Sequence, residues 1–432
     1  MKALVIGGGG REHALVWALS RSSRVGEIVC APGNPGISEL AECVATRADD
    51  ISHLVELARS IRPDLVVVGP EAPLVAGLAD ALERHAPVFG PSSSGARLEG
   101  SKAFAKDLMA SKSIPTAESR TFDNAGEAFS FVEDFGRPVV IKADGLAAGK
   151  GVTVCDDTAA ARDAITKTMV DLRFGEAGSR IVVEERLTGP ELSILAFCDG
   201  KTVLPMQAAQ DFKRALDSDL GSNTGGMGSY SPVPVCTPSI FRQAQDVVLG
   251  PIAEALAEQG THYVGMIYAG LMLTDEGLKV IEFNCRFGDP EIQALIPRFD
   301  SDLAEVMAAS IEGSLAGMEL KWKPDSCVTV VAASEGYPDE PRISTGFPIE
   351  GLTEAGQQDR VVVFHSGTGT KTGRTVTAGG RVLSISALGV DIAEARDRAY
   401  AAISKISFHG MQFRSDIAAV ADSRVTASAK PL

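Results

Sequence analysis

The sequence is poor in positive charge, in paired cysteines and in long apolar runs. Its 41 Lys and Arg residues against 56 Asp and Glu give a formal charge of −15. A general nucleic-acid-binding surface is therefore unexpected, and any anionic substrate needs a local basic cluster. Seven cysteines lie scattered without a Cys-x-x-Cys pair, which argues against a zinc site or a disulfide framework and favours a reducing, cytoplasmic location.

Two further absences concern membranes and targeting. No apolar run approaches the length of a membrane-spanning helix, so no membrane partner is expected. The opening Met-Lys-Ala-Leu-Val-Ile runs straight into glycines, so we expect a first strand there and no signal peptide. No internal repeat of solenoid period is present.

The first 100 residues alternate strand and helix signals. A chain of 432 residues needs several packed units, and this alternation predicts that the first is a doubly wound α/β domain. Its ligand edge is expected at the carboxyl ends of the parallel strands. The expected strands are 3–6, 27–30, 65–68 and 88–89, and the expected helices are 11–19 and 53–59.

The rest of the chain divides into four further segments and a tail. A connecting helix is expected at 101–114, followed by a small α+β unit at 115–190 with strands near 139–142, 152–155 and 181–184. A larger mixed-sheet unit at 191–325 carries a long helix near 239–258. A C-terminal α+β unit at 326–421 contains a helix at 392–403, and the small polar tail, 422–432, is expected to fray.

The most informative segment is Ile281-Glu-Phe-Asn-Cys-Arg-Phe-Gly-Asp-Pro-Glu291. Strand alternation places Glu282, Asn284 and Arg286 on one face. A carboxylate, an amide oxygen and a guanidinium together suit Mg²⁺ beside phosphate. Asp289 is expected to cap a helix that has Pro290 in its first turn. An edge strand with a solvated polar face is the alternative.

Three glycine- or proline-rich loops, 7–13, 31–36 and 69–74, end neighbouring strands on one edge of the predicted sheet. Bare N–H groups at the start of a helix form an anion site, and three loops on one edge suggest a single pocket. A dinucleotide-binding oxidoreductase is the rival hypothesis. Its fingerprint requires glycine where Glu12 stands, and an acidic residue where Cys30 ends the second strand.

Three other motifs suggest nucleotide and anion binding. Residues 142–152, Lys-Ala-Asp-Gly-Leu-Ala-Ala-Gly-Lys-Gly-Val, depart from a Walker loop and suggest a mobile phosphate-covering flap between two strands. At 182–191, backbone groups of Glu185 and Leu187 would meet an adenine edge and the Glu191 carboxylate would meet ribose. The loop at 210–230 combines glycines with cations, which suits an anionic ligand.

Taken together, these motifs resemble the ATP-grasp ligases, and most closely the phosphoribosylamine–glycine ligase family. The resemblance rests on GGGGREH, GPEAPL, LEGSKAF, KADGLAAGKGV, NTGGMG and IEFNCRFGDPE, and extends to Gly379-Gly-Arg-Val382. It implies a two-lobed ATP-grasp region between an N-terminal α/β domain and a small C-terminal domain. It also implies ATP as co-substrate, Mg²⁺ or Mn²⁺, and ligation of glycine to 5-phosphoribosylamine in purine biosynthesis.

The resemblance also implies roles for individual residues. The catalytic candidates are Arg286, Asp211 and Lys213, and the metal ligands are Glu282 and Asn284. The ATP-binding candidates are Lys102, Lys142, Lys150, Gly151, Glu185, Leu187 and Glu191. The substrate-binding candidates are Gly9, Gly10, Arg11, Glu12, His13, Asn34, Gly36, Pro70, Glu71, Asp211, Gly225, Gly226, Met227, Gly228 and Arg286. Phe212 replaces the histidine of the family's Gln-Asp-His-Lys-Arg stretch, so no imidazole acts there.

Two more alternatives stay open at this stage. One is a sister carboxylate–amine ligase with another acceptor, which the loops at 31–36 and 69–74 should discriminate. The other is a nucleotide sensor that keeps the fold without turnover. The family suggests a monomer whose partners are small-molecule substrates.

Overall fold

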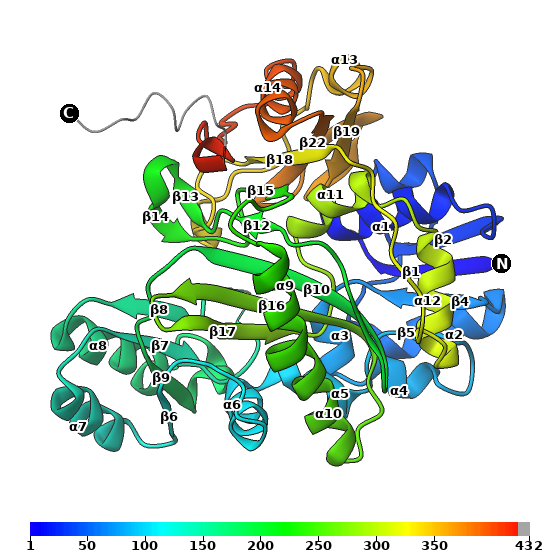
Figure 1. The fold of residues 1–432 in the computed structure, drawn as a ribbon. Coiled ribbons are helices and arrows are strands. Elements are labelled where there is room, and N and C mark those ends of the chain that lie inside the picture. Colours follow the sequence, from blue (N-terminus) through cyan, green and yellow to red (C-terminus); the bar gives the residue numbers. More distant parts are fainter. Residues whose placement is uncertain (148, 422–432) are drawn as a thin grey trace.

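The computed structural model describes residues 1–147 and 149–421. The chain folds into four units: an N-terminal unit, a small lid, a unit built on a central antiparallel sheet, and a C-terminal unit (Figure 1). The predicted α/β class, with an N-terminal doubly wound sheet, is confirmed. The expected tail at 422–432 lies outside the described residues.

The N-terminal unit is a five-stranded parallel sheet in the order β3-β2-β1-β4-β5. β1 lies at its centre, and residues 3–6 of that strand have no exposed surface, so the strand reads as a continuous apolar run. The elements are β1 (Lys2–Gly7), α1 (Gly10–Ser20), β2 (Glu27–Pro32), η1 (Ile37–Glu39), β3 (Glu42–Cys43), α2 (Ile51–Ile61), β4 (Leu65–Val68), α3 (Glu71–Val75), α4 (Leu78–Leu82), β5 (Val88–Phe89), α5 (Ser93–Gly100) and α6 (Lys102–Ser111).

The lid is a four-stranded antiparallel sheet, β6-β9-β7-β8, covered by two helices. Its buried apolar side chains form a cluster separate from the two larger clusters of the molecule, so the lid has its own core. The elements are β6 (Ser119–Phe122), α7 (Ala125–Phe135), β7 (Val139–Ala143), β8 (Val152–Cys155), α8 (Thr158–Ile165), the π-helical η2 (Thr166–Val170), η3 (Gly175–Gly178) and β9 (Ile181–Glu185).

The central unit is built on the antiparallel sheet β11-β10-β16-β17. The expected long helix is confirmed as α9, η5 and α10 in succession, with a π-helical turn between two α-helical stretches. The elements are β10 (Glu191–Asp199), β11 (Val203–Pro205), β12 (Gln210–Asp211), β13 (Arg214–Leu216), η4 (Asp217–Asp219), β14 (Leu220–Asn223), β15 (Gly228–Ser231), α9 (Pro238–Ala244), η5 (Gln245–Leu249), α10 (Gly250–Glu258), β16 (Val264–Thr274), β17 (Gly277–Asn284), α11 (Glu291–Leu295), η6 (Ile296–Arg298) and α12 (Leu303–Glu312).

The C-terminal unit packs back on the molecule through a shared sheet, β12-β15-β18-β22-β19. The strands β12 and β15 come from the segment that carries the polar 210–230 loop, so that loop is hydrogen-bonded to the C-terminal unit. The elements are β18 (Ser326–Ala333), η7 (Glu340–Arg342), α13 (Leu352–Gly356), β19 (Val361–His365), β20 (Thr368–Lys371), β21 (Arg374–Thr377), β22 (Arg381–Gly389), α14 (Ile392–Ile403) and η8 (Ala419–Ala421).

One local expectation is wrong. Pro290, not Asp289, is the N-cap residue of α11, and no side chain caps this helix. The Asp289 carboxylate instead accepts a hydrogen bond from Gln293 Nε2 at 2.8 Å and pairs with Arg381 Nη2 at 3.0 Å. A guanidinium offers a carboxylate a stronger, charge-assisted bond than a backbone N–H does. The pairing partner lies 92 residues away along the chain and is invisible to local patterns.

An aromatic cluster joins the N-terminal unit to the central sheet. The Phe197 ring of β10 lies 5.9 Å from Phe89 of β5 and 6.0 Å from Phe287, and its side chain is fully buried. We expect Phe197→Ala to destabilise the fold by about 3–5 kcal/mol, since it leaves a cavity in a close-packed core. Thermal unfolding measures this effect, with Val390→Ala, at a 74% exposed position, as the control. Equal melting temperatures for the two variants would contradict the prediction.

Candidate functional site

A cavity of about 1240 Å³ opens where the N-terminal unit, the lid, the central sheet and the C-terminal unit meet. It is lined by a majority of the residues predicted for catalysis, metal and ATP. The predicted residues on its wall are Arg11, Glu71, Lys102, Lys142, Gly151, Glu185, Leu187, Glu191, Asp211, Lys213, Gly225, Glu282, Asn284 and Arg286. The fold therefore brings residues as far apart in the sequence as Arg11 and Arg286 to the wall of one cavity.

The other predicted residues lie off this wall. They are Gly9, Gly10, Glu12, His13, Asn34, Gly36, Pro70, Lys150, Gly226, Met227 and Gly228. Sequence reasoning assigned no catalytic or ligand-binding role to several charged or polar groups that do line the cavity, namely Glu99, Lys106, Glu184, Asp289, Glu291 and Arg381. Glu99, Asp289 and Glu291 stand inside motifs quoted from the sequence, and their position there was the available signal.

Arg286 is held by a network of acceptors directly after β17. Its Nη2 donates to Glu99 Oε1 at 3.0 Å and to Asn284 Oδ1 at 3.1 Å, and its Nε donates to Glu71 Oε2 at 3.3 Å. The side chains of Asn284 and Arg286 thus meet, as the predicted alternation would have it, although the strand ends at Asn284 and Arg286 lies in the bend that follows. The Glu99 carboxylate also accepts the backbone N–H of Cys285 at 2.8 Å, which fixes the turn that carries the guanidinium.

The carboxylates around Arg286 have opposed pKa shifts. Burial acts to raise the pKa of Glu71, but the guanidinium groups of Arg286 and Arg11 outweigh it and lower that pKa to about 2. Burial dominates at Glu99 and raises the pKa of its carboxyl. Arg286 therefore faces one firmly ionised carboxylate and one whose charge is costly to bury.

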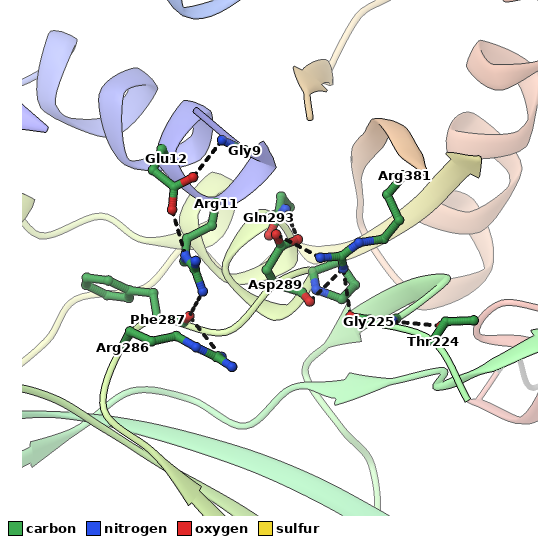
Figure 2. Close-up of polar contacts among 12 residues, drawn as sticks. Gly9, Arg11, Glu12, Thr224, Gly225, Arg286, Phe287, Asp289, Gln293 and Arg381 are labelled. Carbon is green, nitrogen blue, oxygen red and sulfur yellow. Dashed lines mark hydrogen bonds and ion pairs between the residues drawn. The ribbon is translucent and has the colours of Figure 1, made fainter. Parts of the chain in front are cut away.

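The same cluster reaches the first glycine loop (Figure 2). Arg11 donates from Nη1 to the Phe287 carbonyl at 3.1 Å and from Nε to Glu12 Oε1 at 2.7 Å. Glu12 Oε2 accepts the Gly9 N–H at 2.6 Å. The expectation of a bare anion-binding N–H is therefore wrong at Gly9, because an internal carboxylate already occupies that donor.

The substrate-side loops are tied to the C-terminal unit. Asn34 Nδ2 donates to the carbonyls of Gly8 and His365, both at 2.9 Å. The His365 N–H donates to His13 Nδ1 at 2.8 Å. Burial lowers the pKa of His13 to about 3 and that of His365 to about 4. Both imidazoles are therefore neutral at pH 7 and serve as packing and hydrogen-bonding groups.

The predicted phosphate lysines lie on the lid side of the cavity. Lys102, the first residue of α6, donates to the carbonyls of Ala143 at 2.9 Å and Gly145 at 3.1 Å. Lys142 Nζ donates to the Ile281 carbonyl and pairs with Glu184 Oε2, both at 2.9 Å. Burial lowers the pKa of Lys102. Both ammonium groups thus point into the space between lid and central sheet.

The edge predicted for adenosine is the crossing from β9 to β10. The Glu185 N–H donates to the Glu118 carbonyl at 2.9 Å, so the backbone of this residue can offer a ligand only its carbonyl oxygen. Leu187 lines the cavity directly beside it. Glu191 Oε2 pairs with Lys213 Nζ at 3.0 Å. A carboxylate thus lies where the sequence places the ribose contact.

Asp211, in β12, and Lys213, shortly after that strand, also line the cavity. Burial raises the pKa of Asp211 to about 8, and the neighbouring Lys213 counteracts it only in part. Burial also acts to lower the pKa of Lys213, but Glu191 and Asp211 outweigh it and raise that pKa well above its usual value. The cavity floor is therefore a place where bound charge strongly changes protonation.

Arg381 lines the cavity from the C-terminal unit, and Figure 2 shows its contacts with Gly225 and Asp289. Its Nη1 donates to the carbonyls of Gly225 at 2.7 Å and Asp289 at 2.8 Å. Thr224 Oγ1 accepts the Gly226 N–H at 2.9 Å. The backbone of the Gly225–Gly228 loop is therefore fixed at Gly225 by Arg381 of β22 and at Gly226 by Thr224, and its contact with a substrate stays a prediction.

Glu282 and Asn284 offer an oxygen set that fits a hard cation. Burial acts to raise the pKa of Glu282, but Lys213, Lys142 and Lys102 outweigh it and lower that pKa, so the carboxylate is ionised as a metal ligand must be. Across residues 1–147 and 149–421, no cluster of three or more His, Cys, Asp or Glu could hold a metal. The remaining coordination positions would therefore fall to phosphate and water oxygens.

Comparisons with known proteins agree along the whole chain. Family models for phosphoribosylglycinamide synthetase match as the N domain at 1–99, the ATP-grasp (A) domain at 100–292 and the C domain at 327–420. The phosphoribosylamine–glycine ligase of Streptomyces coelicolor is 51% identical over 98% of this chain and 99% of its own. That of Caldanaerobacter subterraneus is 48% identical over 97% of this chain and 100% of its own.

Solved structures support the family through one relative and the fold through a more distant one. The crystal structure of phosphoribosylamine–glycine ligase from Thermotoga maritima has a TM-score of 0.84 at 30% identity, covering 96% of this chain and 100% of that one. Biotin carboxylase from Campylobacter jejuni shares the fold, with a TM-score of 0.74 at 13% identity over 99% of this chain and 96% of that one. Within the described ranges, no helix combines the length and apolarity that crossing a bilayer requires.

The neutral His13 predicts a pH dependence of stability. An unfolded histidine binds its proton near pH 6.5, whereas the folded one does so only near 3, so the unfolded state binds more protons between these values and stability falls as pH falls. The slope is at most about 1.4 kcal/mol per pH unit. His13→Asn keeps an acceptor for the His365 N–H and should give a flatter curve of melting temperature from pH 6.5 to 4. Parallel curves would contradict this.

Proposed function

Because the chain belongs to the phosphoribosylglycinamide synthetase family, we propose that it ligates glycine to 5-phosphoribosylamine. ATP is converted to ADP and phosphate, and the product is glycinamide ribonucleotide, in purine biosynthesis. The chain is a carbon–nitrogen ligase. The observation that carries the proposal is the cavity in which Glu282, Asn284 and Arg286 face the lysines of the lid side.

The reaction we propose passes through glycyl phosphate. The carboxylate of glycine is a poor electrophile, so its oxygen attacks the γ-phosphorus of ATP and ADP leaves. The amine of phosphoribosylamine then attacks the acyl carbon, phosphate leaves, and the amine loses a proton. No nucleophile from the protein is needed, so the protein contributes position and electrostatic stabilisation.

The cationic side chains of the cavity support this role. Lys102 and Lys142 would contact the phosphates of ATP, and Arg286 would face the transferring phosphoryl group and the carboxylate of glycine. Glu282 and Asn284 would hold Mg²⁺ or Mn²⁺, which neutralises phosphate charge when bound. In this structure the Lys102 ammonium is bonded to the carbonyls of Ala143 and Gly145. To bind ATP, it would exchange these two carbonyl oxygens for phosphate oxygens.

Water must be kept from an acyl phosphate while it persists. The segment 145–151, of which residue 148 lies outside the described part, joins β7 to β8 of the lid. We assign Lys150 and Gly151 to this flap. The separate lid core supports movement of the lid as a unit over bound ATP.

The substrates take opposite ends of the cavity in this proposal. Glu185, Leu187 and Glu191 contact adenosine. Glycine lies near Asp211, Lys213 and the Gly225–Gly228 backbone. Phosphoribosylamine lies toward Arg11 and Glu71, on the side of the loops that carry Gly9, Gly10, Glu12, His13, Asn34, Gly36 and Pro70. Since all seven of those loop residues lie off the cavity wall, they act by shaping the Arg11 and Glu71 side of the pocket.

We further propose a cytoplasmic monomer that acts on small molecules only. The negative formal charge of −15 supports the absence of nucleic-acid partners. The seven cysteines are all free, and five of them are buried, which supports a reducing compartment.

The first test is ATP-dependent phosphate release with glycine, Mg²⁺ and phosphoribosylamine generated in place. We expect release only when all components are present, with glycinamide ribonucleotide as product by mass spectrometry. Each component is omitted in turn as a control. A folded protein that binds ATP and releases no phosphate in the full mixture would contradict the proposal and favour a sister ligase or a sensor.

The second test addresses the proposed metal ligand. Glu282→Gln keeps the size of the side chain and removes its charge, so we expect phosphate release to fall at least about 100-fold, the range seen when one group that stabilises transition-state charge is removed. Circular dichroism should show an unchanged fold. Glu276→Gln, an exposed glutamate in the same hairpin, is the matched control. Near-normal activity of Glu282→Gln would remove this residue from the metal site.

A further inference from the structure

The hairpin β13–β14 directly follows the Asp211–Lys213 stretch along the chain. It is hydrogen-bonded to the C-terminal segment 412–417. The Ser415 N–H donates to Asp217 Oδ1, and the Ser218 N–H donates to Asp416 Oδ2, both at 2.8 Å. The Ser415 hydroxyl also donates to the Asp217 carboxylate. Three hydrogen bonds thus join the tip of the hairpin to a segment about 200 residues further along the chain.

Arg414 is the centre of this contact. Its side chain is 1% exposed, and it makes a bidentate pair with Asp416 through Nε and Nη2, both at 2.7 Å. Its Nη1 donates to Asp219 Oδ1 at 2.8 Å and to the Arg214 carbonyl at 3.1 Å. A buried guanidinium with so many of its donors satisfied is held in one geometry.

The guanidinium reaches the cavity floor through one aromatic ring. Its central carbon lies 5.0 Å from the centroid of Phe212, a distance at which a cation attracts the face of a ring. Phe212 is fixed by its own backbone, since its N–H donates to Gly228 O at 3.0 Å and its carbonyl accepts the Met227 N–H at 2.8 Å. Phe212 stands directly between Asp211 and Lys213, both on the cavity wall.

Arg414 itself does not line the main cavity. It lies in a smaller hollow of about 320 Å³, lined also by Leu216, Asp217 and Phe413. It therefore has no path to a substrate except through the residues that it holds. The Lys213 backbone is also fixed at the base of the hairpin, because its carbonyl accepts the N–H of Thr224 at 2.7 Å. A movement of the hairpin would therefore move Lys213 and the Gly225 loop together.

From these contacts we infer that Arg414 is a positioning residue for the glycine end of the reaction, acting through Phe212 and the β13–β14 hairpin on Asp211 and Lys213. The inference rests on the proposed function, because that function places glycine beside these two side chains. Of the three residues that we propose for adenosine, Glu185 and Leu187 lie apart from the β13–β14 hairpin, and only Glu191 meets this stretch, through its 3.0 Å pair with Lys213. Loss of Arg414 should therefore affect glycine far more than nucleotide.

The test compares Arg414→Met with wild type in the phosphate-release assay. Methionine keeps the apolar stem and removes the guanidinium, and we expect kcat/KM for glycine to fall about 10- to 100-fold, the cost of misplacing reacting groups by about an ångström. The Kd for ADP, by equilibrium binding, should stay within about threefold of wild type. Arg398→Met is the matched control and should leave both constants unchanged, since Arg398 of α14 pairs with Glu394 of the same helix and with Asp359 before β19.

A second variant tests the route through the ring. Phe212→Leu keeps an apolar side chain and removes the ring face, so it should lower kcat/KM for glycine in the same direction. If both act through one contact, the double variant Phe212→Leu/Arg414→Met should be little worse than Arg414→Met alone. Additive losses would overturn the route through Phe212.

Three results would overturn the inference. Unchanged kcat/KM for glycine in Arg414→Met excludes a positioning role. Equal losses for glycine and ADP with a lowered melting temperature make Arg414 a structural residue only. A wild-type protein that releases no phosphate with glycine overturns the proposed function, and the inference with it, whereas an active wild type with an equally active variant overturns the inference alone.

Discussion

The structure depends on the burial of one guanidinium of the central unit between two carboxylates of the N-terminal unit. Arg286 follows β17, Glu71 begins α3 and Glu99 lies in α5, and the three are joined at 3.0 to 3.3 Å. A charge withdrawn from water is tolerated only when its partners are in place. The N-terminal unit is thereby fixed against the strand that carries Glu282 and Asn284. The geometry of the proposed metal site thus depends on a helix almost 200 residues earlier in the chain.

The lid is attached to this fixed frame at a few polar points. Asp144, at the end of β7, accepts the Ala103 N–H at 3.0 Å and the Ser101 hydroxyl at 3.1 Å, at the start of α6. A carboxylate at a helix N-terminus is electrostatically favoured, so the flap is anchored beside Lys102. Because the lid core is separate, the lid can rotate about such contacts without opening the core of the central sheet. The firmly held Arg286, Glu71 and Glu99 cluster and the more loosely attached lid fit the proposed reaction, which needs fixed charges and a lid that opens and closes.

The sequence predicts more of the fold than of the site. Apolar runs such as 3–6 and 65–68, each ended by glycine, identify the parallel strands because a buried strand has few other compositions. Glu282, Asn284 and Arg286 could be grouped because two residues along a strand return to the same face. The roles of Glu99 and Arg381 could not be read, since their partners lie 187 and 156 residues away. Asp289 was wrongly predicted to cap a helix for the same reason, since its partner Arg381 is distant in sequence. Gly9 was wrongly predicted to offer a free N–H to an anion, because that N–H is bonded to the Glu12 carboxylate.

The C-terminal unit acts on the site through arginines and a histidine that never need to touch the reacting atoms. Arg381 holds the Gly225 carbonyl, His365 holds His13 beside the first glycine loop, and Arg414 holds the hairpin next to Lys213. The bond from His365 to His13 is buried, so separating the units there would leave a polar group unpaired at a cost of about 1–3 kcal/mol, whereas the bond from Arg381 to the exposed Gly225 contributes less. The shared sheet from β12 to β19 adds backbone hydrogen bonds to the same boundary. The C-terminal unit is therefore part of the cavity wall in energetic terms, and a cavity without it would first lose the alignment of the Gly225 loop and Lys213, the end that we propose for glycine.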